Sequence, residues 1–268
     1  MPMRDAIIDA LTARLRDLPS VRALWLGGSD ATGRRDAYSD IDYCVIADDG
    51  SAGEVFAAAE SALAAISPIE IGYRLPQCPW PHMEQAFYRL RDAGPHLLVD
   101  FCVLSANAPP EARFMERERH GQPQILFDPS GLLAPVPMDR AAHQARIAAR
   151  IADLRQRFPL FQTLVERNLA RGQAVDALHF YMNLTLRPLI DLLRIAYCPD
   201  RFDFGARYLK FDLPPQIAAE VERLSYVPDT EGLRQRLSDA ARLFESTLAQ
   251  IDASGTGVRV ATRPAPAS

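Results

Sequence analysis

Two aspartates, two residues apart, open one of the most apolar stretches of this chain. Asp40 and Asp42 stand on either side of Ile41, at the start of a run over 41–47 that predicts a strand. Residues i and i+2 of a strand project from the same face, so the two carboxylates lie close together and repel each other. Mg²⁺ prefers carboxylate and phosphate oxygens, and the pattern therefore indicates a divalent-metal site.

A glycine turn lies upstream of this pair and directly follows another short apolar run. Gly27 and Gly28 allow a close approach of the backbone to a phosphate, and the Ser29 hydroxyl adds a donor. Arg34 and Arg35 add positive charge nearby. Taken alone, the aspartate pair also fits a polar strand start or a turn. That reading leaves the glycines, the serine and the spacing to be explained separately.

The combination resembles the signature of the DNA polymerase β-like nucleotidyltransferase superfamily. That signature is a Gly-Gly or Gly-Ser turn, a spacer of about ten residues, and Asp-hydrophobic-Asp or -Glu. Gly28 and Ser29 fill the turn, Asp40 and Asp42 fill the acidic positions, and Ser39 gives the common Ser-Asp-Ile-Asp form. The resemblance covers roughly the first 130 residues and implies a nucleotidyltransferase-like mixed sheet with flanking helices.

Members of this family use a third acidic residue on a neighbouring strand. Asp100 is the first candidate, because it interrupts the otherwise apolar run 96–104 and is costly to bury without a partner. An ordinary ion pair with an arginine is the alternative explanation for Asp100. Glu70 is the rival for the third position and lies beside a poorly defined strand.

The resemblance also implies a mechanism. Asp40 and Asp42 would hold two Mg²⁺ ions around the triphosphate of a nucleotide, and Asp100 would complete the metal site and take a proton from an acceptor hydroxyl. That hydroxyl would attack the α-phosphorus, and pyrophosphate would leave. Further residues would bind the phosphates: Gly27, Gly28, Ser29 and Ser39.

The chain divides in character near a proline-containing linker at 134–137. Before the linker we predict strands at 21–26, 41–47, 85–90, 96–104 and 124–127, and helices at 5–17 and 54–66. After it we predict helices at 139–158, 175–197, 214–224 and 231–251, with a kink at Pro188. The expected fold is α+β: a nucleotidyltransferase domain over 1–136, an all-α helical bundle over 137–252 acting as a substrate or lid domain, and a disordered tail over 253–268.

The helical half contains two candidate phosphate ligands. Lys210 is the only lysine of the chain, while arginine supplies every other basic side chain. A retained ammonium group indicates a need for a compact charge, so we expect Lys210, assisted by Arg194, to contact the β- and γ-phosphates. Chance retention of one lysine is the competing explanation, and the polar stripe around Arg194 also fits a solvated helix face.

The layout of the two halves resembles the antibiotic nucleotidyltransferases that modify aminoglycosides or lincosamides. It implies an enzyme that transfers AMP from ATP to a hydroxyl of a small molecule, such as an antibiotic or a metabolite. Two alternatives stay open: transfer to tRNA or to a protein side chain, and a catalytically silent nucleotide-binding module. The sequence does not settle the acceptor, the donor nucleotide or the oligomeric state.

Charge and composition disfavour several other classes of protein. The net charge of −4, and the balance of 16 basic and 15 acidic residues over 139–252, disfavour a protein that tracks a polynucleotide. No apolar run reaches the ~20 residues of a membrane span, and the first residues carry no signal-peptide core. The four scattered cysteines and five histidines form no zinc pattern. We therefore expect a cytoplasmic protein without disulfides or a membrane partner.

Overall fold

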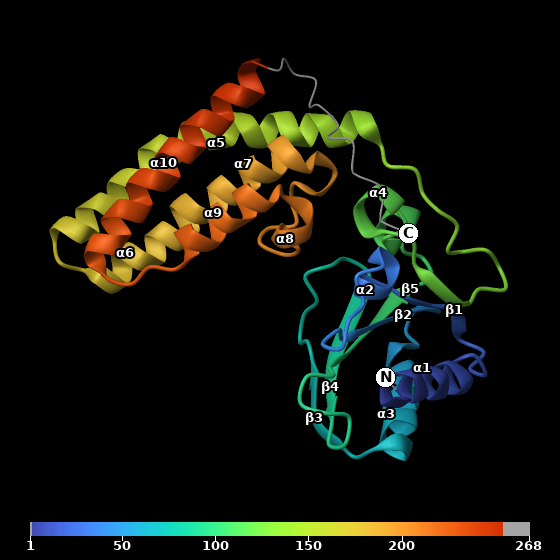
Figure 1. Ribbon diagram of the computed structural model, residues 1–268. Helices are drawn as coiled ribbons and strands as arrows, with labels where there is room; N and C mark the ends of the chain where they lie inside the picture. The colour runs from blue at the N-terminus through green and yellow to red at the C-terminus, as the bar shows by residue number, and fades with distance from the viewer. Residues whose placement is uncertain (1, 254–268) are drawn as a thin grey trace. The chain divides into compact units, whose positions relative to one another are not determined.

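The computed structural model of this protein describes residues 2–253 (Figure 1). The chain forms two compact units that divide between Met138 and Asp139, two residues from the division expected at 136/137. The tail expected over 253–268 lies outside the described residues except for Ala253, which ends the last helix. Each unit has its own fold and is described by itself.

The first unit is a mixed sheet with helices. Its elements are α1 (Pro2–Leu15), β1 (Val21–Leu26), α2 (Gly28–Thr32), β2 (Ile41–Ala47), α3 (Ala52–Ile66), β3 (Ile69–Arg74), β4 (Met83–Leu90), β5 (Val99–Ser105), η1 (Pro110–Arg113), α4 (Arg117–His120) and β6 (Gln124–Phe127). The six strands lie in the order β3-β4-β5-β2-β1-β6. Only β2 and β5 pair in parallel, and the other neighbours are antiparallel.

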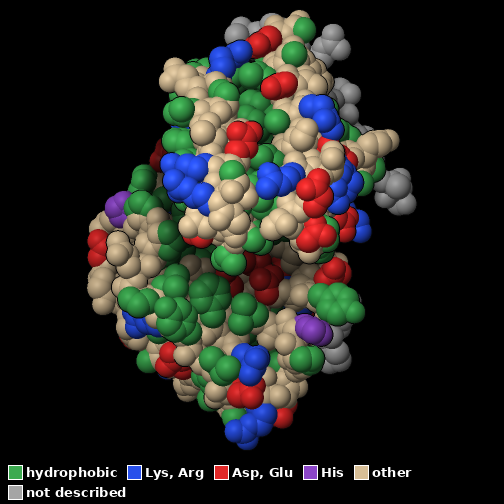
Figure 2. All heavy atoms as spheres, turned by 90° about the vertical axis from the view of Figure 1, so that its left-hand side faces the viewer, with side chains coloured by type: hydrophobic (Ala, Val, Ile, Leu, Met, Phe, Trp, Pro, Cys, Tyr) green, Lys and Arg blue, Asp and Glu red, His purple; other side chains and the backbone are tan. Residues whose placement is uncertain are grey.

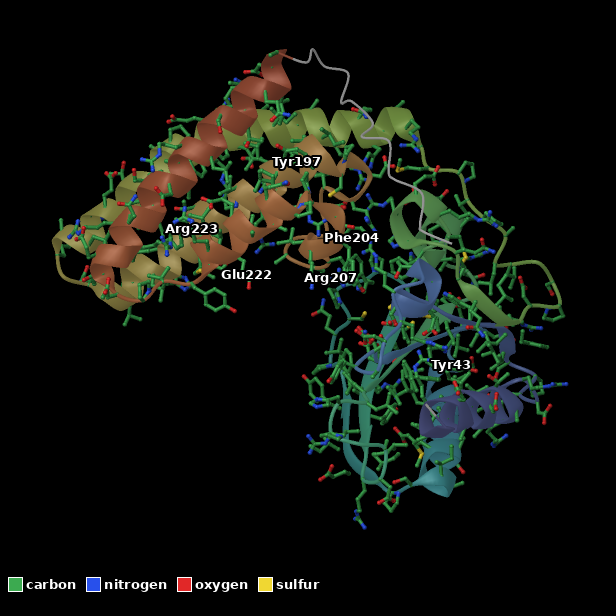
Figure 3. All side chains as sticks on the ribbon, in the orientation of Figure 1. Tyr43, Tyr197, Phe204, Arg207, Glu222 and Arg223 are labelled. Carbon is green, nitrogen blue, oxygen red and sulfur yellow. The ribbon has the colours of Figure 1, made fainter. Side chains whose placement is uncertain are left out.

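The two faces of this sheet are covered differently because side chains alternate along each strand. The alternate positions of β2 that include Tyr43 and Val45 pack against α1 and α3 and form the main core (Figure 1). The Tyr43 hydroxyl lies 2.9 Å from Thr12 Oγ1 of α1 (Figure 3). The opposite face carries a smaller cluster around Trp25 and Cys44, covered by apolar side chains of the segment 106–136. Asp42 belongs to this second face.

The described residues of the second unit, 139–253, form helices and their connections, and no strand. Its elements are α5 (Arg140–Ala170), α6 (Ala174–Phe180), η2 (Tyr181–Leu186), α7 (Arg187–Tyr197), η3 (Pro199–Arg201), α8 (Leu209–Asp212), α9 (Pro215–Ser225) and α10 (Thr230–Ala253). Phe158 of α5 stacks on Phe244 of α10 with 3.6 Å between ring centroids, which brings the two longest helices together (Figure 1). The buried apolar faces of these helices form one core of their own.

The α+β fold class predicted from the sequence is confirmed, although several elements differ from the prediction. Strand β3, which the sequence indicated only as a poorly defined strand beside Glu70, is mostly exposed. Helix α5 continues through Pro159 to Ala170, beyond the predicted end at Phe158. The irregularity expected at Pro188 is the π-helical turn η2, which ends immediately before α7.

Candidate active site

Asp42 and Asp100 are direct neighbours on two parallel strands. They are Cα partners in the register of β2 and β5, so both side chains project from the same face of the sheet. Asp40 precedes β2 by one residue, and its charge acts on both of the other carboxylates. The structure therefore brings together the three acidic residues that the sequence singled out.

Burial and mutual repulsion make these carboxylates hard to ionise together. Burial is the main factor that raises the pKa of Asp42, and the charges of Asp40 and Asp100 raise it further, to about 7. The pKa of Asp100 is also raised, mainly by burial, although a hydrogen bond from Gln85 opposes this. A bound cation would reverse the shift in both groups, because it would favour the charged forms.

The turn before α2 holds the Asp42 side chain. Gly28 has φ +49°, and a Cβ atom built on it would overlap with Asp42 Oδ2, so only glycine fits here without displacing the carboxylate. The backbone N–H of Gly27 donates to the carbonyl oxygen of Asp42 at 2.9 Å. The backbone N–H of Ser29 donates to the Asp42 carboxylate, which lowers its pKa. The glycine turn thus positions a carboxylate directly.

Two serines of the predicted phosphate site have different surroundings. Ser29 Oγ is buried and has no hydrogen-bond partner within residues 2–253, although it belongs to the turn that holds Asp42. The Ser39 hydroxyl donates to Asp36 Oδ1 at 3.1 Å and accepts from the Asp36 N–H at 2.9 Å, so it stabilises the loop before β2. Of the two hydroxyls, Ser29 is therefore the one left for a ligand.

Gln85 and Glu70 distinguish the two candidates for the third carboxylate. Gln85 Nε2 of β4 donates to Asp100 Oδ1 at 2.6 Å and fixes the orientation of that carboxyl group. Glu70 lies on the edge strand β3, where β4 and β5 separate it from β2, and it pairs with Arg89 at 3.0 Å. Asp100, and not Glu70, joins the aspartate pair.

Arg4 is a site residue that the sequence analysis missed. It is 6 % exposed, pairs with Asp30 of α2, and donates from Nη2 to the carbonyl oxygen of Asp40 at 3.1 Å. It thereby ties α1 to α2 and to the loop before β2. A signal was available, because Arg4 stands three and seven residues before the buried Ile7 and Leu11 and so lies on the apolar face of the helix.

The three carboxylates are the type of ligand that a hard divalent cation takes. Within residues 2–253, however, no three His, Cys, Asp or Glu side chains are arranged as a complete metal site. Carboxylate oxygens are the ligands that Mg²⁺ takes, and Mg²⁺ commonly completes its shell with water and substrate phosphate. The raised pKa of Asp42 and the orphaned hydroxyl of Ser29 are the two features that a metal–phosphate pair would relieve. Asp40, Asp42 and Asp100 are the residues that would hold it.

The two candidate phosphate ligands of the second unit, Arg194 and Lys210, differ in their exposure to solvent. Arg194 is 0 % exposed and donates to backbone oxygens of Gly205 at 2.6 Å and Arg201 at 3.2 Å, and to the Asp212 carboxylate at 3.0 Å. In this packing Arg194 cannot contact a phosphate, so its expected role as a phosphate ligand is corrected. It instead holds the segment 198–212, which Figure 3 shows at Phe204 and Arg207. Lys210 of the same loop is exposed.

Comparisons with known proteins give the following. No protein-family model matches the chain, and no curated protein does. Among solved structures, it is similar to spectinomycin adenyltransferase AAD(9) from Enterococcus faecialis, solved with ATP and spectinomycin, at 10% identity and a TM-score of 0.35, covering 92% of this chain and 98% of that one. It is also similar to JHP933 from Helicobacter pylori at 15% identity and a TM-score of 0.28, covering 94% of each chain.

The similarity to solved structures thus includes a nucleotidyltransferase. None of the helices within residues 2–253 has an apolar stretch long enough to cross a bilayer. All four cysteines are free thiols, and Cys44 and Cys102 are buried in the smaller cluster of the sheet.

Proposed function

We propose that this protein is a magnesium-dependent nucleotidyltransferase that transfers AMP from ATP to a hydroxyl group of a small molecule and releases pyrophosphate. The observation that carries the proposal is the register of Asp42 with Asp100 across parallel strands, with Asp40 close enough to act on both and with Gly28 beneath the Asp42 carboxylate. The charge of Asp40 raises the pKa of both Asp42 and Asp100, an unfavourable arrangement that a structural ion pair would not have.

The chain's own residues divide the work. Asp40 and Asp42 would hold the metal ions, and Ser29 would donate from its free hydroxyl to a phosphate oxygen. When bound, Mg²⁺ supplies charge stabilisation for the entering and leaving oxygens. Asp100, whose Oδ1 is held by Gln85, would take the acceptor's proton on Oδ2 while the acceptor oxygen bonds to the α-phosphorus and the bond to pyrophosphate breaks.

The test is transfer of a labelled AMP group. The full chain is incubated with ATP labelled in the adenosine, Mg²⁺ and a panel of aminoglycosides, lincosamides and metabolites, and acceptors are identified by a mass gain equal to one AMP. We expect Asp100→Asn to lower the rate by at least about 100-fold, as loss of a general base does. The matched control Glu70→Gln removes an acid of the same sheet and should keep full activity.

Rates that are equal in Asp100→Asn and in the wild type would contradict this assignment of Asp100.

In the same proposal, the exposed ammonium group of Lys210 binds the triphosphate, so Lys210→Ala should weaken ATP binding about tenfold. Arg242→Ala is the control for loss of an exposed cation. An unchanged affinity for ATP in Lys210→Ala would remove this lysine from the site.

A further inference from the structure

A row of cross-strand neighbours leads from the carboxylates to the edge of the sheet. Asp42 is in register with Asp100, Asp100 with Phe87 of β4, and Phe87 with Tyr73 of β3. Residues in register on adjacent strands project from the same face, with Cβ atoms about 5 Å apart. Phe87 and Tyr73, which we call the aromatic row, therefore continue the line of catalytic carboxylates across the same face.

The aromatic row is open to solvent. Tyr73 is 54% exposed, Phe87 is half-buried, and the neighbouring Ile71 is 51% exposed. Helices α1 and α3 cover the other face of the sheet. Figure 2 looks onto the side where β3 and β4 lie in Figure 1, and it shows hydrophobic side chains gathered on the first unit. Apolar groups clustered at a surface beside polar functional groups are typical of a ligand site.

Charge around the aromatic row favours an uncharged ligand. Arg89 lies on β4 two residues from Phe87, is in register with Ile71, and pairs with Glu70 at 3.0 Å, so this pair adds no net charge. Gln85, two residues from Phe87 in the other direction, is a neutral amide that binds Asp100. The negative charge is thus confined to the carboxylate end of the row.

We propose that Phe87 and Tyr73 bind the acceptor of the transferase proposed above. The acceptor is an uncharged molecule that has a planar or alicyclic apolar face and carries its reactive hydroxyl beside that face. Its ring stacks on the two aromatic side chains, and its hydroxyl reaches Asp100 one strand away. The inference rests on the proposed function for the identity of the reaction, but the binding itself can be measured without turnover.

The test compares two glucosides whose aglycones differ: one is the aromatic 4-nitrophenyl group and the other a methyl group. Binding of 4-nitrophenyl β-D-glucopyranoside and of methyl β-D-glucopyranoside to the full chain is measured by calorimetry, with Mg²⁺ and a non-hydrolysable ATP analogue present. We expect the wild type to prefer the aryl glucoside by about tenfold, as loss of one stacked ring commonly costs. Tyr73→Ser and Phe87→Leu should reduce that preference to about threefold or less.

Controls separate this site from general stickiness. Ile125 of β6 is 51% exposed and lies at the opposite edge of the sheet, in register with Trp25, so Ile125→Ala should keep the full preference for the aryl probe. Tyr73→Ser changes an exposed side chain and Phe87→Leu retains bulk, so both should fold, as circular dichroism will verify. Equal binding of the two glucosides to the wild type would overturn the inference. So would a loss of the preference for the aryl glucoside in Ile125→Ala as large as that in Tyr73→Ser.

A third probe tests the opposite chemistry. Choline carries a hydroxyl and a quaternary ammonium group, and tighter binding of choline than of the aryl glucoside, lost in Tyr73→Ser, would overturn the inference in favour of a cationic acceptor. Failure of the proposed function has a different signature. In that case the wild type would bind no ATP analogue with Mg²⁺, whatever it does with the glucosides.

Discussion

At the scale of single residues, Asp42 is a carboxyl group whose environment differs strongly from water. Its carboxyl is held by the turn at Gly28 and Ser29, and burial and the neighbouring charges raise its pKa to about 7. An acid in this state accepts a proton readily and gains most from a bound cation. Asp42 therefore makes the site sensitive to pH in the neutral range.

Asp42 should couple Mg²⁺ binding to pH. Since Mg²⁺ displaces the proton, the apparent affinity should fall by up to about tenfold for each pH unit below 7 and should level off above 7. Calorimetric titration of the protein with Mg²⁺ between pH 5.5 and 8.5 measures this. An affinity independent of pH over that range would contradict the raised pKa of Asp42.

The raised pKa of Asp42 also decides whether the free energy of unfolding of the metal-free protein rises or falls with pH. The pKa of Asp42 is higher in the folded chain than its usual 3.8, so between about pH 4 and pH 7 the folded state holds a proton that the unfolded state has lost. Stability from this group is therefore greatest below pH 4, falls as pH rises to 7, and is constant above. Asp42→Asn should flatten this dependence in denaturation curves and abolish AMP transfer.

At the scale of the elements, the connection from β1 through α2 to β2 decides whether the site forms. Gly28 and Gly33 both have positive φ and stand at the two ends of α2, but only Gly28 faces a carboxylate. The two glycines share a backbone requirement and differ in their surroundings. Substitution of each glycine therefore separates two effects: the strain of a side chain at positive φ, and the displacement of the Asp42 carboxylate.

We expect Gly28→Ala to destabilise the protein by at least about 1–2 kcal/mol and to abolish Mg²⁺ binding, because the new Cβ overlaps with Asp42 Oδ2 in addition to the strain of a positive φ. Gly33→Ala, with φ +67° and no atom within 4 Å of its Cβ, should show the strain alone and keep Mg²⁺ binding. Urea denaturation and Mg²⁺ titration of both variants test this. Equal loss of metal binding in the two would contradict it.

The strands of the candidate site could be predicted from sequence with useful accuracy. The strands at 21–26, 41–47 and 124–127 have the predicted bounds, because short apolar runs bounded by turn residues indicate them clearly. Strand β3 was only poorly defined in the prediction, because its alternation of apolar and other residues runs for six residues, most of which are exposed. Without its bounds, the register of Tyr73 with Phe87 could not be predicted.

At the scale of the whole molecule, the two units have separate hydrophobic cores. The clusters of the sheet draw only on residues of the first unit, and the helical cluster draws only on residues of the second. Arg194 belongs to the second core region and binds backbone oxygens there. Changes to one core should therefore be felt mainly by its own unit.

We expect calorimetry to resolve two unfolding transitions, and Arg194→Ala to lower only the one that belongs to the helical unit, by about 3 kcal/mol or more. The reason is that the variant leaves several buried oxygens without a donor. Arg155→Ala removes an exposed pair with Asp252 and should shift neither transition measurably. A shift of both transitions in Arg194→Ala would contradict the separation of the cores.

The sequence by itself determined the α+β class, and it singled out the candidate acidic residues and a proline-containing linker near the boundary of the two units. Those features follow from local periodicity and spacing, which are properties of neighbouring residues along the chain. Only the tertiary structure decided that Asp100 rather than Glu70 faces Asp42, that Arg194 is buried, and that Phe87 and Tyr73 extend the row. These depend on strand order, register and burial, and such long-range pairings are fixed by packing between segments far apart in sequence.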